Sequence, residues 1–514
     1  VVTEQLSEVC CPNDENLTIL KPGKQKADGT FEKEYIPSQK PTVDMAKRIE
    51  DNLPETMEIT GDKGITLQDV YKGKNTIEDF VAQLSVEELA QIVRGEGMSN
   101  PRVTQGTASA FGGISDALFN YGIPAACCAD GPSGLRYDGK ATQLPIGTAL
   151  SASWNAPLVR ELYTMEGQEL YGNQVDTLLG PGVNIHRHPL NGRNFEYYSE
   201  DPYLSGTMSV ASTGGIKDGG AWGTIKHFAL NGQESHRFKI DAVCSERAIR
   251  QIYLKSFEMA VKAGTVKTLM TAYNPINGHW AASNYDLCTT ILRNEWGYDG
   301  IVMTDWWAKM NDVVEGGEES NQDTRDMVRS QNDVYMVVNN NGAEVNSNND
   351  NTEESIKEGR LTIGELQRAA INICNFILSA PVIERELVDT DVAKHYDSVP
   401  NDQAKYEVFN IEKDNKVMFN SGAEATLEVE DEGEYTIIVN ISFDKSNLSQ
   451  STVNVNANGT TMVVIQTNGT DGNWITQKLC KVKLDKGVYN LKLEEVLAGI
   501  KVKYIQFKKI PKKK

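Results

Sequence analysis

Basic residues and histidines are scarce in this sequence. Its 514 residues include 51 lysines and arginines against 71 aspartates and glutamates, which gives a formal net charge of −20, and it contains 6 histidines. The only basic run is the lysine-rich tail at 508–514, so the chain offers phosphates no basic face. We therefore expect no nucleic-acid partner.

Long hydrophobic runs and dinucleotide-binding motifs are also missing. No apolar stretch approaches the roughly 20 residues that a membrane-spanning helix needs, so we expect no membrane partner. No Gly-x-Gly-x-x-Gly motif follows a predicted strand, which argues against a dinucleotide site. The sequence gives no reason to expect a cofactor.

The eight cysteines are spread thinly and form no recognisable metal or disulfide framework. Two pairs are adjacent, Cys10–Cys11 and Cys127–Cys128, and no Cys-x-x-Cys occurs. This usage indicates reduced thiols in a cytoplasmic protein or one from an anaerobe, with no metal site. The chain starts at Val1 without a methionine, and we expect it to have been cut or recorded without its beginning.

Short apolar runs alternate with helical stretches over residues 61–385. Strands are expected at 123–129, 177–179, 223–228, 268–273, 300–304 and 334–338, and helices at 155–171, 245–263 and 363–378. Repeated β–α order over this length predicts an α/β fold, either a (β/α)8-type TIM-like barrel or a doubly wound sheet. The barrel is the preferred interpretation.

The character of the chain changes after a linker at 386–403. Short alternating stretches separated by glycine turns occupy residues 404–514, with strands expected at 424–429, 435–442, 451–455, 461–466, 477–484 and 488–493. This pattern predicts a β-sandwich domain after the barrel.

Polar side chains occur where several predicted strands of the barrel end. Asp130, Lys226, His227, Tyr273 and Asp305 each stand at or next to such an end. Any one of them alone is more simply a helix cap or a buried core residue, but catalytic groups of barrels lie at the carboxyl ends of strands. The series therefore predicts an active site. Two tryptophans follow Asp305 and supply flat apolar faces, as a carbohydrate site requires.

Four stretches in this order resemble the barrel of glycoside hydrolase family 3, over roughly residues 65–380. They are Asp130-Gly-Pro-Ser-Gly-Leu-Arg136, the glycine-, histidine- and arginine-rich stretch 180–206, Lys226-His-Phe-Ala-Leu-Asn-Gly-Gln-Glu-Ser-His-Arg237 and Met303-Thr-Asp-Trp-Trp307. The resemblance implies that Asp305 is the nucleophile that attacks the anomeric carbon. It further implies substrate-binding roles for a set of residues: Asp130 (at O4 and O6 of the sugar), Arg193, Lys226, His227, Tyr273 and Trp306.

Other acids of these motifs have structural interpretations. Glu196, Glu200 and Asp201 are expected to pair with nearby arginines, and Glu234 is expected to pair with Arg237. Lys226 and Arg193 would favour the charged form of Asp305.

A second catalytic carboxyl group, about 5–5.5 Å from the nucleophile, is needed by a retaining glycosidase. In family members resembling this chain it comes from a separate α/β sandwich domain, which the 514 residues lack. One branch uses a histidine on a barrel loop, which is not recognisable here. In one subgroup the α/β sandwich and a fibronectin-like domain precede the barrel. We therefore interpret residues 1–60 as the end of such a fibronectin-like domain with its linker, and expect a second polypeptide or N-terminal fragment to supply the acid/base.

The resemblance thus implies a retaining exo-β-glycosidase, with β-glucosidase the leading hypothesis because Asp130 suits a sugar with a C6 hydroxymethyl group. The alternatives are a β-xylosidase and a catalytically incomplete carbohydrate-binding protein. The terminal sandwich resembles carbohydrate-binding modules around 446–450 and 470–474, although a structural or oligomer-forming domain is equally compatible. A homo-oligomer remains open.

Overall fold

The computed structural model describes most of the chain. The described residues are 18–37, 43–387, 395–404, 408–410, 416–419, 423–445, 451–467, 469–495 and 499–511. The chain forms two compact units, one from Val1–Thr60, Cys128–Tyr335 and Asn351–Pro381, the other from Gly61–Cys127, Met336–Asp350 and Val382–Lys514. Residues 1–17, the first part of the stretch assigned to the end of a fibronectin-like domain, lie outside the described residues.

An eight-stranded, largely parallel sheet confirms the TIM-like barrel. Its order is β11-β8-β7-β6-β5-β4-β3-β14, and a parallel bridge between Met303 and Val334 joins the end of β11 to the residue before β14. The strands are β3 (Arg94–Glu96), β4 (Ser109–Gly112), β5 (Ala125–Asp130), β6 (Thr177–Leu179), β7 (Trp222–Phe228), β8 (Thr268–Thr271), β11 (Ile301–Met303) and β14 (Tyr335–Val338). The six strands predicted from apolar runs are present within a few residues, and β3 and β4 are additional.

Buried threonines form one layer inside the sheet. Thr177, Thr224 and Thr268 have no exposed surface, and their hydroxyls lie 2.8–2.9 Å from one another. A buried hydroxyl is costly unless it is hydrogen-bonded, and here each one finds its partner on a neighbouring strand. The layer therefore fixes the register of β6, β7 and β8.

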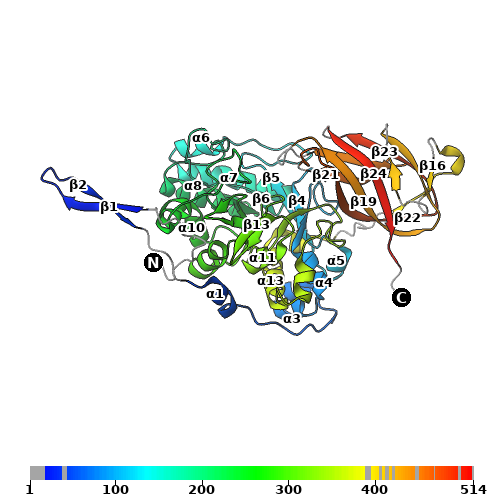
Figure 1. Ribbon diagram of the computed structural model, residues 1–514, viewed down its shortest axis with the longest axis horizontal. Coiled ribbons are helices and arrows are strands. Elements are labelled where there is room, and N and C mark those ends of the chain that lie inside the picture. Colours follow the sequence, from blue (N-terminus) through cyan, green and yellow to red (C-terminus); the bar gives the residue numbers. More distant parts are fainter. Residues whose placement is uncertain are drawn as a thin grey trace. The chain divides into compact units, whose positions relative to one another are not determined.

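Amphipathic helices cover the outside of these strands. Helices α7 and α8 lie side by side (Figure 1), and a Cβ atom at Gly215 would lie 2.3 Å from the carbonyl oxygen of Arg160, so glycine permits their close approach. The helices of this unit are α1 (Met45–Asp51), α6 (Gly147–Ala152), α7 (Ala156–Gly172), α8 (Pro202–Asp218), α9 (Glu246–Ala248), η2 (Ile249–Tyr253), α10 (Lys255–Lys262), η3 (Ala281–Ser283), η4 (Asp286–Glu295), α11 (Thr324–Arg329), α12 (Thr352–Lys357) and α13 (Ile363–Ser379).

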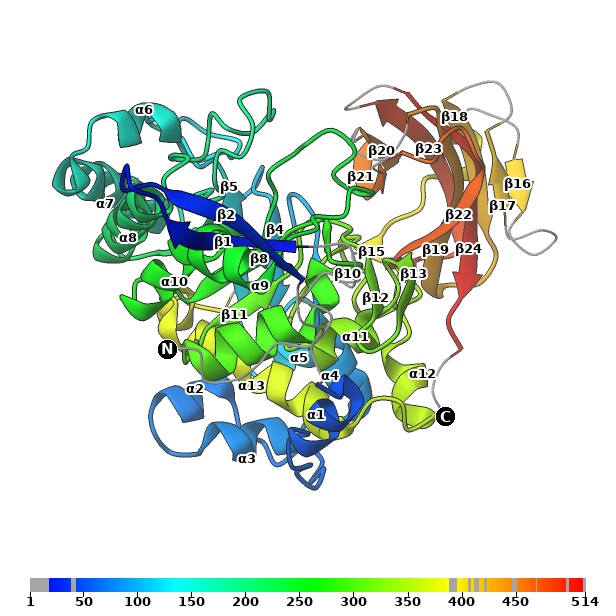
Figure 2. The same ribbon diagram turned by 60° about the vertical axis from the view of Figure 1, so that its left-hand side comes forward.

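The other unit contains short helices and the terminal sandwich. Its helices are α2 (Leu67–Tyr71), α3 (Ile77–Ala82), α4 (Val86–Ile92), α5 (Asp116–Asn120), η5 (Pro381–Glu384) and η6 (Asn401–Gln403). Helix α4 begins with a capping box formed by Ser85 and Glu88. Two five-stranded sheets, β15-β22-β19-β24-β17 and β16-β18-β23-β20-β21, form the sandwich (Figure 2).

Alternating side chains of the two sheets fill the sandwich core. In β19, Ile437, Val439 and Ile441 are fully buried while Ile438 and Asn440 between them are partly exposed, which is the period of a strand with one covered face. The strands are β15 (His395–Tyr396), β16 (Val408–Asn410), β17 (Lys416–Met418), β18 (Glu424–Val429), β19 (Gly433–Phe443), β20 (Ser451–Ala457), β21 (Thr460–Thr467), β22 (Ile475–Leu484), β23 (Gly487–Glu495) and β24 (Ile500–Lys509). The stretch 446–450 lies outside the described residues, and Trp474 is half exposed.

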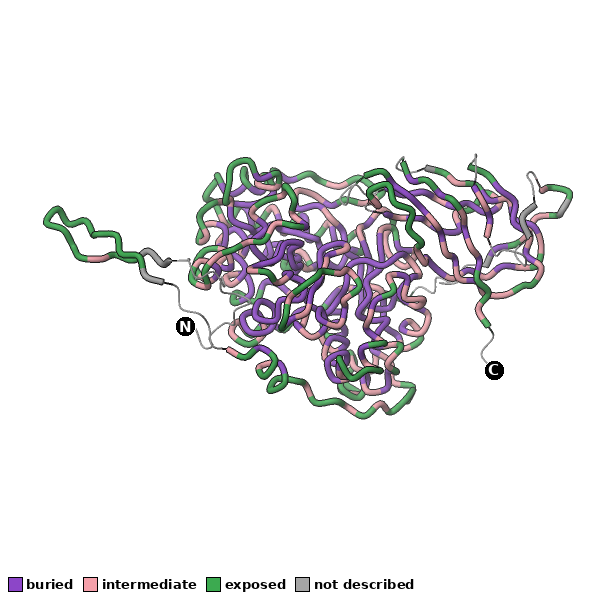
Figure 3. Tube along the Cα trace, viewed as in Figure 1, coloured by how far each residue is buried: buried purple, intermediate pink, exposed green. Residues whose placement is uncertain are grey.

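A separate hairpin precedes the barrel. It pairs β1 (Thr18–Gln25) with β2 (Phe31–Pro37), and the described side chains along it are mostly exposed, Phe31 and Tyr35 among them (Figure 3). The assignment of residues 1–60 to a fibronectin-like domain and its linker stays a prediction.

Candidate active site

The predicted site residues gather at the carboxyl ends of neighbouring strands in one unit. Asp130 ends β5, Lys226 and His227 lie near the end of β7, Tyr273 follows β8, Asp305 and Trp306 follow β11, and Arg193 lies in the loop between β6 and α8. Because β5, β6, β7, β8 and β11 are parallel neighbours, their ends meet at one edge of the barrel.

Asp305 is a buried carboxyl group with one oxygen left for chemistry. The backbone N–H of Trp306 donates to its Oδ1 at 2.8 Å, while the described residues offer Oδ2 no hydrogen-bond partner. Burial raises the pKa of Asp305, and the charges of Arg237, Arg193 and Lys226 oppose that rise. The sequence-based expectation that cations surround Asp305 is met, but burial outweighs them.

His227 faces Asp305 as a neutral imidazole. Its Nε2 lies 3.6 Å from Asp305 Oδ2, and burial, followed by the charges of Arg193 and Lys226, holds its pKa well below the ordinary value. The Tyr197 hydroxyl accepts from Asn231 Nδ2 at 2.9 Å and forms a hydrogen bond of 3.1 Å with His227 Nδ1. When the phenol is the donor in that bond, the proton of His227 lies on Nε2, on the side that faces Asp305.

Asp130 lies between two cations. Its Oδ1 is 3.1 Å from Lys226 Nζ and its Oδ2 is 3.2 Å from a nitrogen of Arg136. Burial opposes the charged carboxylate, yet Lys226 and Arg136 keep the pKa of Asp130 below its ordinary value. The group is therefore a charged acceptor, suited to the hydroxyls of a polyol.

A guanidinium that the sequence interpretation treated as structural also belongs to this cluster. Arg237 pairs with Glu234 at 2.9 Å, as predicted, but its guanidinium also lies 4.4 Å from the centre of the Tyr273 ring. It is the leading positive charge acting on Asp305. Burial and the neighbouring Asp305 raise the pKa of Tyr273 well above its ordinary value, so the phenol keeps its proton.

Sequence reasoning missed the roles of Arg136, Arg237, Tyr197 and Asn231. Arg136 and Arg237 end two of the quoted motifs, so their positions were visible. Tyr197 and Asn231 act through His227, a long-range relation that spacing does not reveal. Arg193 pairs with Glu196, as expected, and Trp306 is 7% exposed beside Asp305.

The arrangement suits attack by a carboxylate on a polar, hydroxyl-rich substrate. A partly desolvated carboxyl group, a neutral imidazole donor and several cations converge on one small region. Within the described ranges, no group of three or more histidine, cysteine, aspartate or glutamate side chains could hold a metal ion. Nor is any helix in the described part of the chain long and apolar enough to cross a membrane.

The chain is similar to several known proteins. Residues 59–376 match the family described as "Glycosyl hydrolase family 3 N terminal domain". A β-glucosidase of Ruminococcus albus is 43% identical over 522 residues, covering 99% of this chain and 54% of that protein. An exo-α-(1→6)-L-arabinopyranosidase of Bifidobacterium breve is 36% identical over 58% of this chain and 38% of its own length.

A solved structure is similar over nearly the whole chain. It is a β-glucosidase from Paenibacillus barengoltzii, with 54% identity and a TM-score of 0.80, covering 98% of this chain and 55% of that one. This chain therefore spans about half the length of these two β-glucosidases. Because the family match covers more than half of its residues, the chain belongs to glycosyl hydrolase family 3.

Proposed function

We propose that this chain provides the sugar-binding and nucleophile-bearing part of a retaining exo-β-glycosidase that removes terminal β-D-glucosyl residues. The observation that supports the proposal most is Asp305. Its Oδ2 has no hydrogen-bond partner among the described residues, and the neutral His227 lies beside it at 3.6 Å. A nucleophilic carboxylate requires an uncommitted oxygen in a partly desolvated site.

The proposed reaction has two steps. In the first, Asp305 Oδ2 bonds to C1 of the sugar, and the C1–O bond to the aglycone breaks. The aglycone oxygen keeps the electron pair and takes a proton from the acid/base group. In the second, water attacks C1 and gives a proton back to that group, and the Asp305 carboxylate is released. Two inversions at C1 retain the anomeric configuration.

The acid/base group is assigned to a polypeptide or N-terminal fragment outside this chain. Glu234 is the carboxyl group of the barrel loops to consider first, but Arg237 binds one of its oxygens at 2.9 Å and Asn231 Nδ2 the other at 2.8 Å. Both oxygens of Glu234 are therefore engaged within the barrel loop. This favours the expected α/β sandwich domain as the source.

The preference for glucose rests on Asp130, a charged acceptor beside Lys226 and Arg136. Two β-glucosidases share 43% and 54% identity with the chain. A β-xylosidase is the closest alternative, and the arabinopyranosidase name of another relative makes pentopyranosides the substrates to compare.

The test is trapping of the glycosyl-enzyme. A 2,4-dinitrophenyl 2-deoxy-2-fluoro-β-D-glucoside has a leaving group that departs without protonation, so the reaction does not require the acid. Peptide mass spectrometry of the treated chain should find the fluoroglucosyl ester on Asp305. A label on another residue, or no label at saturating reagent, would refute the assignment.

A second candidate is a catalytically incomplete carbohydrate-binding protein. It is motivated by the coverage of only about half of the relatives' length. This candidate predicts that calorimetry detects glucose binding while no ester is trapped. The leading proposal requires the ester.

A further inference from the structure

Two short hairpins continue from the segments that contain Tyr273 and Asp305. The first pairs β9 (Pro275–Ile276) with β10 (His279–Trp280) and starts just after Tyr273. The second pairs β12 (Met310–Asp312) with β13 (Gly316–Ser320) and starts shortly after Asp305 and Trp306. Whatever fixes one hairpin against the other therefore also fixes the two site segments.

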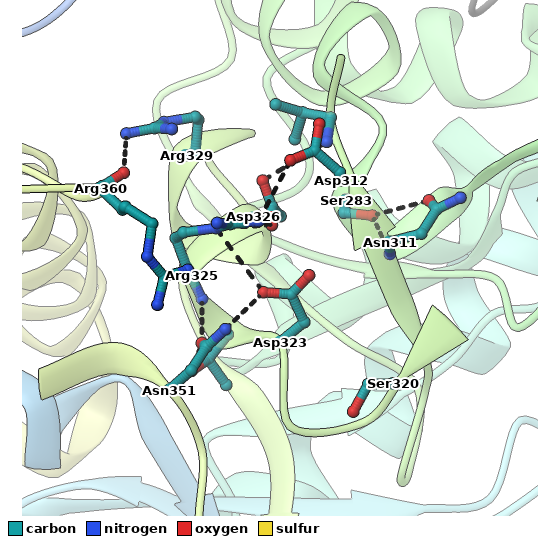
Figure 4. Close-up of polar contacts among 12 residues, drawn as sticks. Ser283, Asn311, Asp312, Ser320, Asp323, Arg325, Asp326, Arg329, Asn351 and Arg360 are labelled. Atoms are coloured by element: carbon teal, nitrogen blue, oxygen red, sulfur yellow. Dashed lines mark hydrogen bonds and ion pairs between the residues drawn. The ribbon is translucent and has the colours of Figure 1, made fainter. Parts of the chain in front are cut away.

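Asn311 of β12 makes that connection. It is 1% exposed; its Oδ1 accepts from the backbone N–H of Trp280 at 3.1 Å, and its Nδ2 donates to the carbonyl of Gly278 at 3.1 Å. The hydroxyl of Ser283, also buried, accepts from the backbone N–H of Asn311 at 3.0 Å (Figure 4). The side-chain amide thus binds the turn and strand β10 of the neighbouring hairpin, with a further contact to the carbonyl of Gly317 in β13 at 3.5 Å.

The opposite side of the β12–β13 hairpin is held by α11. Arg325 Nη2 lies 3.2 Å from Asp312 Oδ2, and Asp326 Oδ1 accepts from the backbone N–H of Val313 at 3.4 Å (Figure 4). These contacts anchor the hairpin to a helix rather than to the Tyr273 segment. Asn311 and Ser283 therefore couple the two hairpins, in addition to the pairing of β8 with β11 that already joins the two site segments.

We propose that Asn311 is a positioning residue, which fixes Asp305 and Trp306 relative to Tyr273 through the two hairpins. This inference rests on the proposed function, since it concerns the step in which Asp305 attacks the sugar. A buried amide whose donors and acceptor are all engaged specifies one alignment of the elements it joins. A misplacement of about 1 Å in a reacting group can lower a rate about 10²-fold.

The rate of trapping separates positioning from stability. In a stopped-flow experiment with the dinitrophenyl fluoroglucoside, the amplitude of the dinitrophenolate burst measures the fraction of competent sites. The rate constant of the burst reports the geometry of attack by Asp305. Asn311→Ala should lower the rate constant at least about tenfold with the amplitude preserved. Ser283→Ala should lower it in the same direction, by less, because one of the connecting bonds is lost.

Ser320→Ala is the matched control. The Ser320 hydroxyl accepts from the Gln322 backbone at 3.0 Å within its own loop, so this variant removes a serine hydrogen bond of the hairpin without touching β9–β10, and its rate constant should be unchanged. If Asn311→Ala does not fold, the rate constant of trapping in Ser283→Ala decides whether the contact between the hairpins positions Asp305. A reduced amplitude with an unchanged rate constant would show a merely structural role and overturn the inference. Failure of the unsubstituted chain to form the ester on Asp305 would instead overturn the proposed function, and this inference with it.

Discussion

Replacing Asp130 with alanine should lower turnover of a β-glucoside far more than turnover of a β-xyloside. Asp130 is a charged acceptor, with Lys226 at 3.1 Å and Arg136 at 3.2 Å. In the proposed complex it accepts from O4 and O6 of the sugar. Xylose has no C6 hydroxymethyl group, so the substitution removes no O6 hydrogen bond from the complex with a xyloside.

The size of the difference follows from the charge of the acceptor. A hydrogen bond to a charged group contributes about 1.5–3 kcal/mol. At about 1.4 kcal/mol for each factor of ten, the loss at O6 alone amounts to about 10- to 150-fold in kcat/KM. The substitution also leaves Lys226, which is 4% exposed, without its counterion. That cost falls on both substrates, so the ratio of the two rates isolates the contribution of O6.

The assay compares kcat/KM for 4-nitrophenyl β-glucoside and β-xyloside in the unsubstituted chain, Asp130→Ala and Asp130→Asn. The asparagine variant keeps the size and one acceptor but not the charge, and should lie between the other two. Equal losses on both substrates would refute the reasoning, because Asp130 would then act through Lys226 and not through O6.

Three further outcomes are expected. Asp305→Ala should lower aryl glucoside turnover by several orders of magnitude with an unchanged circular dichroism spectrum; more than about a tenth of the activity remaining would exclude a nucleophilic role. The isolated chain should cleave an activated aryl glucoside but hydrolyse cellobiose about 10²- to 10⁴-fold more slowly than it does once the preceding domains are added; full cellobiose activity without them would place the acid/base in this chain, with Glu234 the first candidate. Burial raises the pKa of Glu96 to about 8 in the folded state, so its contribution to stability is complete below the ordinary value of 4.5 and is lost as the pH rises through about 8. Glu96→Gln should therefore flatten the decline of the unfolding free energy between pH 5 and 8 in urea titrations, and an unchanged slope would show that Glu96 does not titrate in this range.

The strands that could be predicted from the sequence are those whose own residues dictate burial. The run Ile301–Met303 is continuously apolar and fully buried, as strands covered on both faces are. Strand β3 has a different character, because Arg94 and Glu96 are buried polar residues. Asp350 binds the Arg94 guanidinium at 2.7 Å, and that partner is distant in sequence, so local pattern alone does not indicate a strand.

The site residues likewise divide into those that the local sequence indicates and those that depend on partners distant in sequence. Acids and cations at the ends of strands could be predicted because parallel strands bring those ends together. Arg237 was assigned to Glu234, a correct local pair at spacing i,i+3. Its second position, 4.4 Å from the Tyr273 ring centre, depends on the loop after β7 turning over the end of β8, and no local spacing encodes that turn.

The pKa of Asp305 depends more on desolvation than on the charged side chains around it. The sequence names the cations, and Arg193, Lys226 and Arg237 all act on the carboxyl group, yet burial still raises its pKa. Desolvation depends on how closely the surrounding loops pack, which is a property of the folded chain. A poorly hydrated carboxylate is the more reactive nucleophile toward C1, and the cations around Asp305 limit the rise in its pKa. Removing one of the cations should therefore raise the pKa of Asp305 further, so the arginines around it govern the pH at which it can attack as well as the binding of the sugar.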